Sequence, residues 1–197
     1  MSRKPQTPPR GRIGPIVTVA ILAILAVGAV VYWRLHGSQA ALTPVGAKHV
    51  LLAVGQTAPP FDVRTSTGEV KSADLAGKAW LVEVFAVWCP HCQNEAQTLT
   101  QISKKYNGKL AVVGIVGSPY GFDENSPISE GDVTKFAADF GAGYPLGFDT
   151  TGVSPNPYLR DGFPSLTLVA PDGKVAWVDA GEIDGAALEK QINAVLK

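Results

Sequence analysis

Trp88-Cys89-Pro90-His91-Cys92 follows directly on the apolar run 80–87. The two cysteines are the only ones in the chain, and just two residues separate them. A buried strand that ends in a Cys-x-x-Cys motif is a common way to place a redox-active dithiol at the N-terminus of a helix. We therefore predict a strand, a tight turn and a helix here, with a reactive dithiol at the junction.

The order of these residues predicts different roles for the two thiols. Pro90 has no amide hydrogen to leave unpaired in a first helical turn, while the other free N–H groups and the helix dipole favour a thiolate on Cys89. His91, when protonated, adds a second favourable interaction for that anion. Cys92 follows one turn later and can close a small disulfide ring. We expect Cys89 to act as the nucleophile and Cys92 to resolve the mixed disulfide.

A metal site and a structural disulfide are the alternatives for the same two cysteines. Zinc takes three or four protein ligands, but the other histidines of the chain, His36 and His49, lie in or beside the N-terminal region. A disulfide that closes so short a loop constrains the unfolded chain little. We predict neither a metal nor a bound cofactor.

The N-terminal region predicts a membrane anchor. The first twelve residues carry four basic and no acidic side chains, and residues 16–33 contain no charge. At about 1.5 Å per residue, this run approaches the thickness of a bilayer core. We predict a basic cytoplasmic tail at 1–12, a transmembrane signal-anchor at 13–34 and a linker at 35–54.

The charge pattern also predicts which side of the membrane the domain occupies. A basic N-terminal flank keeps the N-terminus in the cytoplasm, so the rest of the chain faces outward from a bacterial cell membrane. A cleaved signal peptide is the alternative, because Ser38-Gln39-Ala40 offers a small-x-small site. The apolar run is longer than a usual signal core, and we favour a single-pass anchor. The domain is exported under either interpretation.

Residues 55–197 are numerous enough for one domain with its own core. From Ala41 to the C-terminus the chain carries twelve basic and seventeen acidic residues. No basic patch with interleaved aromatic residues occurs, which argues against a nucleic-acid partner. Two cysteines at a catalytic spacing, in an oxidising compartment, indicate that neither is used to staple the fold.

Hydrophobic periodicity and turn residues place the other elements. A continuous apolar run indicates a central strand covered on both faces, and Pro171-Asp172-Gly173 indicates a hairpin. We expect strands at 61–64, 69–71, 80–87, 110–116, 144–148, 165–170 and 174–178, a short one near 49–54, and helices at 90–106, 132–140 and after Asp184. The result is an α/β fold with a central mixed sheet flanked by helices.

Three motifs give the chain a resemblance to a known family. These are the Trp-Cys-x-x-Cys after an apolar strand, the upstream stretch 55–61 (Gly-Gln-Thr-Ala-Pro-Pro-Phe) and Gly162-Phe163-Pro164-Ser165 before the hairpin. Together they resemble the thioredoxin superfamily, in particular its membrane-anchored TlpA/ResA branch with a redoxin or AhpC/TSA-like domain. The resemblance implies a thioredoxin-like fold, disulfide exchange with protein cysteines, and a membrane redox partner that recycles the dithiol.

Two acidic residues are expected to serve the dithiol. Glu83 stands in the middle of the apolar strand, where an ionised carboxylate is costly, so its pKa should be raised and it could move the proton of Cys92. Thioredoxins have a buried acid at the matching position. Glu95 lies one turn after Cys92 on the same helix, and ResA-like proteins carry a glutamate at this spacing in their active-site chemistry. The alternatives are that Glu83 reaches solvent at an edge and that Glu95 is an exposed surface acid.

The resemblance also implies a substrate-binding edge. Pro164 is expected to be a cis-proline facing the dithiol, which would keep a backbone amide away from the thiolate. Phe163 would offer its backbone N–H and C=O to an extended substrate segment, and Trp88 would shield one edge of the site. Partly buried aromatic residues without this role are the alternative for Trp88 and Phe163.

Two positions depart from related families. Ser165 stands where cytochrome c maturation reductants typically have glutamate, and Ala86 stands where peroxiredoxins need threonine, so both of those assignments are disfavoured. His91 points the other way, because Cys-Pro-His-Cys is the motif of DsbA-like oxidants, in which a more stable thiolate makes the disulfide more oxidising. We favour a reductant or isomerase, with a disulfide-forming oxidant as the alternative. A copper-chaperone module using Cys89, Cys92 and His91 as soft ligands is a further alternative.

Overall fold

The computed structural model describes residues 51–149 and 157–197. The predicted transmembrane segment at 13–34 and most of the predicted linker lie outside these residues. Within the described ranges, no helix is both long and apolar enough to cross a bilayer.

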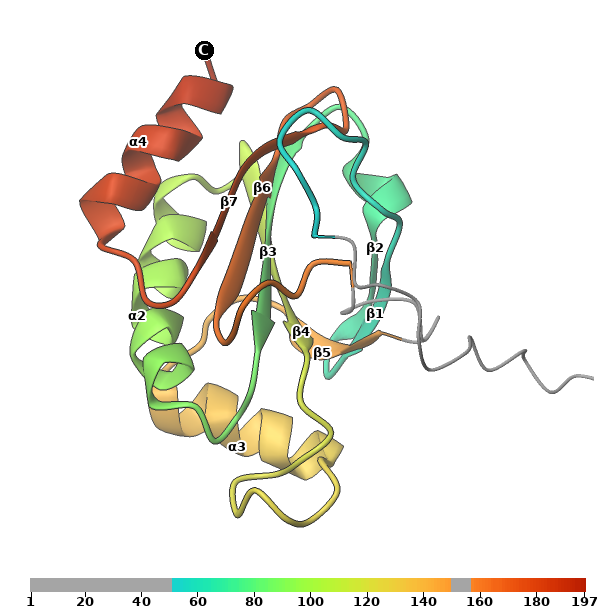
Figure 1. The fold of residues 1–197 in the computed structure, drawn as a ribbon, viewed down its shortest axis with the longest axis vertical. Helices are drawn as coiled ribbons and strands as arrows, with labels where there is room; N and C mark the ends of the chain where they lie inside the picture. The colour runs from blue at the N-terminus through green and yellow to red at the C-terminus, as the bar shows by residue number, and fades with distance from the viewer. Residues whose placement is uncertain (1–50, 150–156) are drawn as a thin grey trace, which may run out of the picture. The chain divides into compact units, whose positions relative to one another are not determined.

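A seven-stranded mixed sheet forms the centre of the described domain (Figure 1). The strands lie side by side in the order β2-β1-β5-β4-β3-β6-β7. The elements are β1 (Asp62–Thr65), β2 (Gly68–Lys71), the 3-10 helix η1 (Ser72–Leu75), β3 (Ala79–Phe85), α2 (Pro90–Lys105), β4 (Leu110–Val116), α3 (Glu130–Phe140), β5 (Leu146–Asp149), β6 (Ser165–Val169), β7 (Val175–Ala180) and α4 (Gly185–Val195). The predicted mixed sheet with flanking helices is confirmed.

The central strand β3 is buried along its whole length. It pairs in parallel with β4 and antiparallel with β6. A neighbouring strand on each edge and cover on both faces explain why its sequence is almost continuously apolar. Glu83 therefore lies at the centre of the sheet, opposite Gly114 of β4 and Leu166 of β6.

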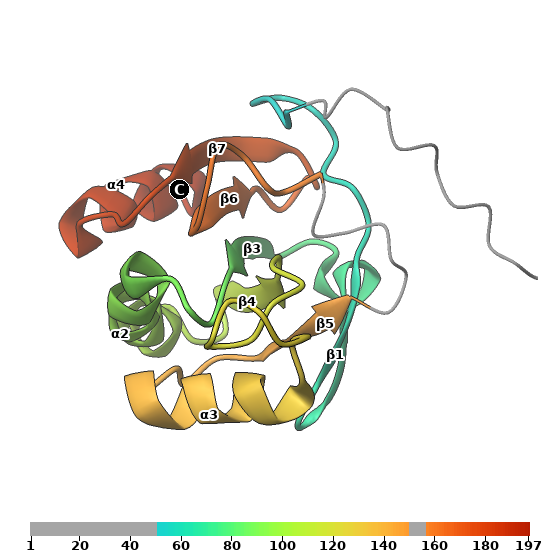
Figure 2. The ribbon, with the colours of Figure 1, turned by 60° about the horizontal axis from the view of Figure 1, so that its bottom comes forward.

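The two faces of the sheet are covered differently (Figure 2). Helices α2, α3 and α4 lie on one face, and their buried side chains, such as Leu99, Phe136 and Leu188, form one core cluster with β3. The other face is covered by chain segments that contribute Phe61 and Tyr158, packed edge-to-face on Trp80. This arrangement leaves the N-terminus of α2 at the end of the sheet where β3 stops.

Local chemistry explains two of the boundaries that differ from the prediction, and one predicted strand is absent. Helix α3 begins at Glu130 because Ser129 caps it, accepting from the backbone N–H of Asp132 while the Asp132 side chain accepts from the backbone N–H of Ser129. Strand β5 begins at Leu146 because Pro145 has no N–H to donate. Residues 51–54 form no strand, so the short strand predicted near 49–54 is wrong for the part that the structure describes.

Candidate active site

Cys89 is the N-cap residue of α2, with extended backbone angles (φ −78°, ψ 117°), and Pro90 follows in the first turn. The backbone N–H of Cys89 donates to the carbonyl of Ala86 at 3.2 Å, which holds the turn between β3 and α2 closed. The first turn of α2 contains no acidic side chain. The positive end of the helix dipole therefore faces the Cys89 sulfur without a competing carboxylate from its own turn.

The two thiols have different surroundings. Cys89 is 6% exposed, and its S–H donates to the backbone carbonyl of Phe163 at 3.5 Å, whereas Cys92 is fully buried. Burial, followed by the nearby Glu83 carboxylate, raises the pKa of Cys92 far above its usual range, against a lowering hydrogen bond from the Ala86 backbone. At neutral pH Cys92 is therefore held as a thiol.

The loop before β6 forms the opposite wall of the site. The Phe163–Pro164 peptide bond is cis, as the resemblance implies. The ring of Phe163 packs edge-to-face on Trp88 with 5.9 Å between ring centroids. It also packs against Gly117, where an added Cβ would lie 2.7 Å from the Phe163 ring. A glycine at the end of β4 thus lets the phenylalanine lie close to the dithiol.

Trp88 is fixed from the other side by a residue that the sequence did not point to. Its indole Nε1–H donates to the hydroxyl of Ser118 at 2.9 Å, and that hydroxyl also accepts from the backbone N–H of Tyr120 at 3.1 Å. Trp88 is partly buried, and it joins the turn before α2 to the loop after β4. This geometry agrees with the expectation that Trp88 borders the site.

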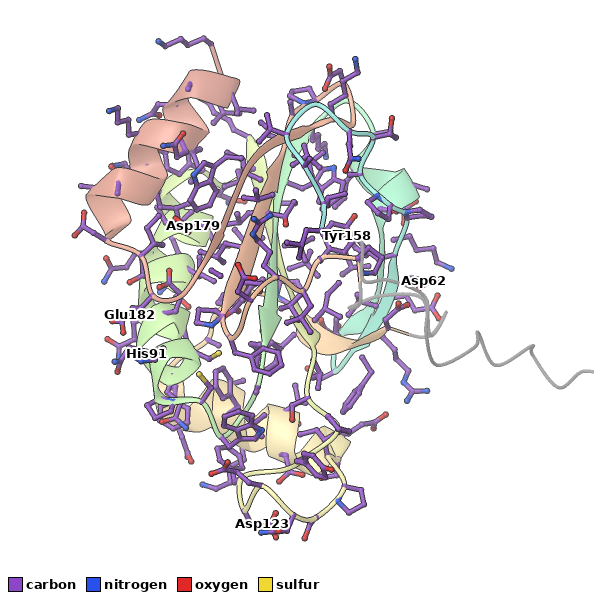
Figure 3. All side chains as sticks on the ribbon, viewed as in Figure 1. Asp62, His91, Asp123, Tyr158, Asp179 and Glu182 are labelled. Atoms are coloured by element: carbon purple, nitrogen blue, oxygen red, sulfur yellow. The ribbon has the colours of Figure 1, made fainter. Side chains whose placement is uncertain are left out.

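His91 points toward the loop between β7 and α4 (Figure 3). Its Nδ1 lies 3.1 Å from a carboxylate oxygen of Glu182, which also accepts from the side chain of Asn94 at 3.3 Å. Hydrogen bonds from His91 and then Asn94 hold the pKa of Glu182 below its usual value. Among the described residues, the hydrogen-bond partner of the His91 ring is Glu182 and not Cys89. A protonated His91 therefore forms an ion pair with Glu182.

Glu83 is fully buried beneath the dithiol. The hydroxyl of Tyr144 donates to its Oε2 at 2.6 Å, while Oε1 has no hydrogen-bond partner among the described residues. Desolvation raises the pKa of Glu83 to about 8, against the lowering effect of the Tyr144 hydrogen bond and with a smaller raising effect from Glu95. The alternative that Glu83 reaches solvent at an edge is wrong.

Glu95 is also fully buried, so the alternative of an exposed surface acid is wrong. Its Oε2 accepts from the backbone N–H of Ile183 at 2.9 Å, which ties α2 to the loop before α4. Desolvation raises its pKa to about 7, opposed by the Ile183 hydrogen bond and assisted by the charge of Glu182. Two buried carboxyl groups with raised pKa values thus interact with one another, and Glu83 also interacts with Cys92.

Among the described residues, metal-ligating side chains do not gather at the site. In residues 51–149 and 157–197, no three His, Cys, Asp or Glu side chains come together in a way that could hold a metal ion. The imidazole nearest to the cysteines in sequence, His91, is engaged with Glu182.

A mixed sheet with helices over one face, a Cys-x-x-Cys at a helix N-terminus and a cis-proline loop opposite define a thioredoxin-like redox domain. Comparison with known families agrees: the profile of the AhpC/TSA family matches residues 54–178, and the chain belongs to this family.

Individual relatives carry names from the same class. Thioredoxin-like protein YneN of Bacillus subtilis (strain 168) is 27% identical over 174 residues, which cover 88% of this chain and 94% of YneN. Thiol-disulfide oxidoreductase ResA of Geobacillus kaustophilus is 25% identical over 186 residues, which cover 91% of this chain and 95% of ResA. A solved structure from Chlorobium tepidum, described as a thiol:disulfide interchange protein DsbE, is 31% identical, covers 74% of this chain and 99% of that one, and has a TM-score of 0.64. The predicted thioredoxin-like fold and ResA-like resemblance are confirmed.

Proposed function

We propose that this chain is an exported thiol-disulfide oxidoreductase that exchanges disulfides with protein cysteines. The observation that carries the proposal is the unequal pair of thiols, with Cys89 at a helix N-terminus and Cys92 buried behind it above a carboxyl group. The names of YneN, ResA and DsbE support the same class. The chemistry requires no bound cofactor.

In the reducing direction, the Cys89 thiolate attacks one sulfur of a partner disulfide, and the partner's other sulfur leaves as a thiolate. Cys92 then loses its proton and attacks Cys89, which releases the partner's second sulfur and forms the Cys89–Cys92 disulfide. Two electrons pass from the dithiol to the partner. A membrane redox partner would reduce the dithiol again, and the oxidising direction is the same sequence in reverse.

Trp88, Phe163 and Pro164 form the proposed substrate-binding edge. In the resting structure the Phe163 carbonyl accepts from Cys89. Once Cys89 is a thiolate or a mixed disulfide, it no longer donates, so this carbonyl becomes available to a backbone N–H of an extended substrate. Pro164 has no N–H and so offers no competing donor to the thiolate.

Glu83 and Glu95 are proposed to manage protons at the buried thiol. A group with a pKa near the working pH is an effective proton acceptor and donor. Glu83 is the direct candidate for Cys92, because its charge is one of the main contributions to the raised pKa of that thiol. Glu95 acts more remotely, through its charge interaction with Glu83.

Reduction of insulin by the full chain in detergent tests the proposed function. With dithiothreitol as electron donor and a chelator to remove metals, we expect repeated turnover above the dithiothreitol background. Cys89→Ser should lower turnover to that background while leaving the circular dichroism spectrum unchanged. Absence of turnover by the metal-free wild type would instead favour the copper-chaperone module, which has no need to exchange disulfides.

The charge at the start of α2 influences the reduction potential of the dithiol, and this potential determines the direction of electron flow. We favour a reductant or isomerase. His91→Pro should destabilise the Cys89 thiolate and make the reduction potential more negative, by on the order of 30 mV, or about 1.4 kcal/mol. Glu182→Gln removes a negative charge from the same place and should shift the potential the opposite way. Equilibration with glutathione buffers, monitored by Trp88 fluorescence, measures the reduction potentials of both variants. A wild-type potential at the strongly oxidising end of the superfamily would reverse our preference.

The proposed location is the outer side of a bacterial cell membrane, with the 13–34 segment as a single-pass anchor. This rests on the uncharged run and its basic flank. The full chain should remain with membranes after alkaline carbonate washing. A soluble mature protein that begins at Ala41 would show a cleaved signal peptide instead.

A further inference from the structure

Gly114 leaves a gap beside the buried carboxyl group of Glu83. It is the direct neighbour of Glu83 in the parallel pair of β3 and β4. A Cβ at this position would lie 2.3 Å from Leu146 Cδ2, 3.3 Å from the Tyr144 ring and 3.4 Å from Glu83 Oε2. Any larger residue would therefore displace the side chains that meet there, whereas glycine allows a tyrosine ring to reach the middle of the sheet.

Leu146 lies closest over Gly114, and Tyr144, from the segment before β5, packs beside it. Tyr144 is 5% exposed, and its hydroxyl donates to Glu83 Oε2 at 2.6 Å. The next residue, Pro145, accepts from the backbone N–H of Gly114 at 2.9 Å, which holds the segment in place against β4. The contact is therefore fixed from both the side chain and the backbone.

The contact makes the two oxygens of Glu83 different. Oε2 is engaged by Tyr144, and Oε1 is buried without a hydrogen-bond partner among the described residues. An unpaired buried oxygen is unfavourable, and it is the atom left free to receive a proton. The titratable groups around this carboxyl are Cys92 and Glu95 from α2 and Tyr144 itself. Its β6 neighbour, Leu166, brings no charge.

We propose that Tyr144 is a positioning residue for proton transfer between Cys92 and Glu83, and that Gly114 leaves room for its ring beside Leu146. The inference rests on the proposed disulfide exchange. In the resolving step the Cys92 proton passes to Glu83 Oε1, the Cys92 sulfur attacks Cys89, and the partner's sulfur leaves as a thiolate. Tyr144 holds the other oxygen and stabilises the ionised carboxyl that must accept the proton.

The sign of the effect follows from the hydrogen bond. Tyr144→Phe removes a donor to the ionised form, so the pKa of Glu83 should rise further above about 8. Less carboxylate is then present at pH 7, and each unit of pKa is tenfold in that fraction. We expect the resolving step to slow by about tenfold at pH 7 and to recover at higher pH, while the first attack by Cys89 is unchanged.

Single-turnover reaction of the reduced full chain with one equivalent of Ellman's reagent, an aromatic disulfide, separates these steps. The first molecule of coloured thiolate reports attack by Cys89, and the second reports resolution by Cys92. Measured against pH, the second phase of Tyr144→Phe should be shifted to higher pH. Tyr106→Phe is the matched control, because Tyr106 is equally buried but its hydroxyl donates to Asn193.

Variants of Glu83 and Gly114 complete the experiment. Glu83→Gln should slow the second phase and remove its inflection near pH 8, and adding Tyr144→Phe to it should change nothing more, because the two residues act as a unit. Gly114→Ala should shift the second phase in the same direction, because the added Cβ crowds Leu146 and then the Tyr144 ring. A wild type without a second phase would refute the exchange itself. A normal wild type and a Glu83→Gln variant that lacks the inflection, with Tyr144→Phe identical to wild type, would refute the role of Tyr144 alone.

Discussion

Iodoacetamide should alkylate Cys89 in the reduced protein about a hundredfold faster, or more, than Cys92 at pH 7. The thiolate is the reacting species, and Cys89 lies at the N-terminus of α2 where the helix dipole favours it. Cys92 is fully buried, and its pKa is raised by that burial and by Glu83. Peptide mass spectrometry after short exposures gives both rates from one sample.

A second variant checks the same assignment without relying on accessibility. Cys92→Ala leaves the nucleophile in place but removes the resolving thiol, so it should accumulate mixed disulfides with protein partners, while Cys89→Ala should not. Equal alkylation of the two cysteines would contradict the nucleophile assignment. Mixed disulfides formed through Cys92 would contradict it as well.

Much of the fold could be predicted because its signals are local. The apolar run before Cys89 has the length and composition of a doubly covered strand, and it becomes β3. The apolar spacing after Pro90 gives α2 to within one residue. The shifts at the starts of α3 and β5 depended on the cap by Ser129 and on Pro145, which are single-residue effects.

The polar partners of the site could not be predicted, because they come from distant parts of the chain. Tyr144 lies 61 positions after Glu83, and Glu182 lies 91 positions after His91. A sequence shows that Glu83 stands in an apolar strand and requires a partner, but the tertiary fold selects which residue supplies it. The same holds for Glu95, whose burial depends on the loop that brings Ile183 over it.

His91 also has a partner from a distant part of the chain. Its position inside the motif predicts a charge that acts mainly on the Cys89 thiolate. The structure places a carboxylate 3.1 Å from the ring, so the charge felt by Cys89 is that of a half-exposed pair and is weakened by its own partner and by solvent. A moderate effect of His91→Pro on the potential is therefore expected, smaller than an isolated histidine cation would give.

Glu83→Gln should change the pH dependence of stability more than any other single substitution considered above. Desolvation raises the pKa of Glu83 from about 4.5 in the unfolded chain to about 8 in the folded protein. Between these values the folded state keeps a proton that the unfolded state has released, so stability is fully present below about pH 4.5 and is lost as the pH rises toward 8. Over about 3.5 pH units at about 1.4 kcal/mol each, the loss is on the order of 5 kcal/mol at most.

Urea unfolding of the wild type and of Glu83→Gln from pH 5 to pH 9 measures this pH-dependent contribution of Glu83 to the free energy of unfolding. The wild-type free energy of unfolding should fall with pH, and the variant should show a much shallower slope, with the remaining slope reduced further by Glu95→Gln. The slope is the informative quantity, because a buried glutamine amide adds a cost that is the same at every pH. Glu124→Gln, at an exposed position, is the control and should leave the slope unchanged. Parallel curves for the wild type and Glu83→Gln would mean that Glu83 is ionised in the folded protein at neutral pH, and its assignment as the proton acceptor poised for Cys92 would then be wrong.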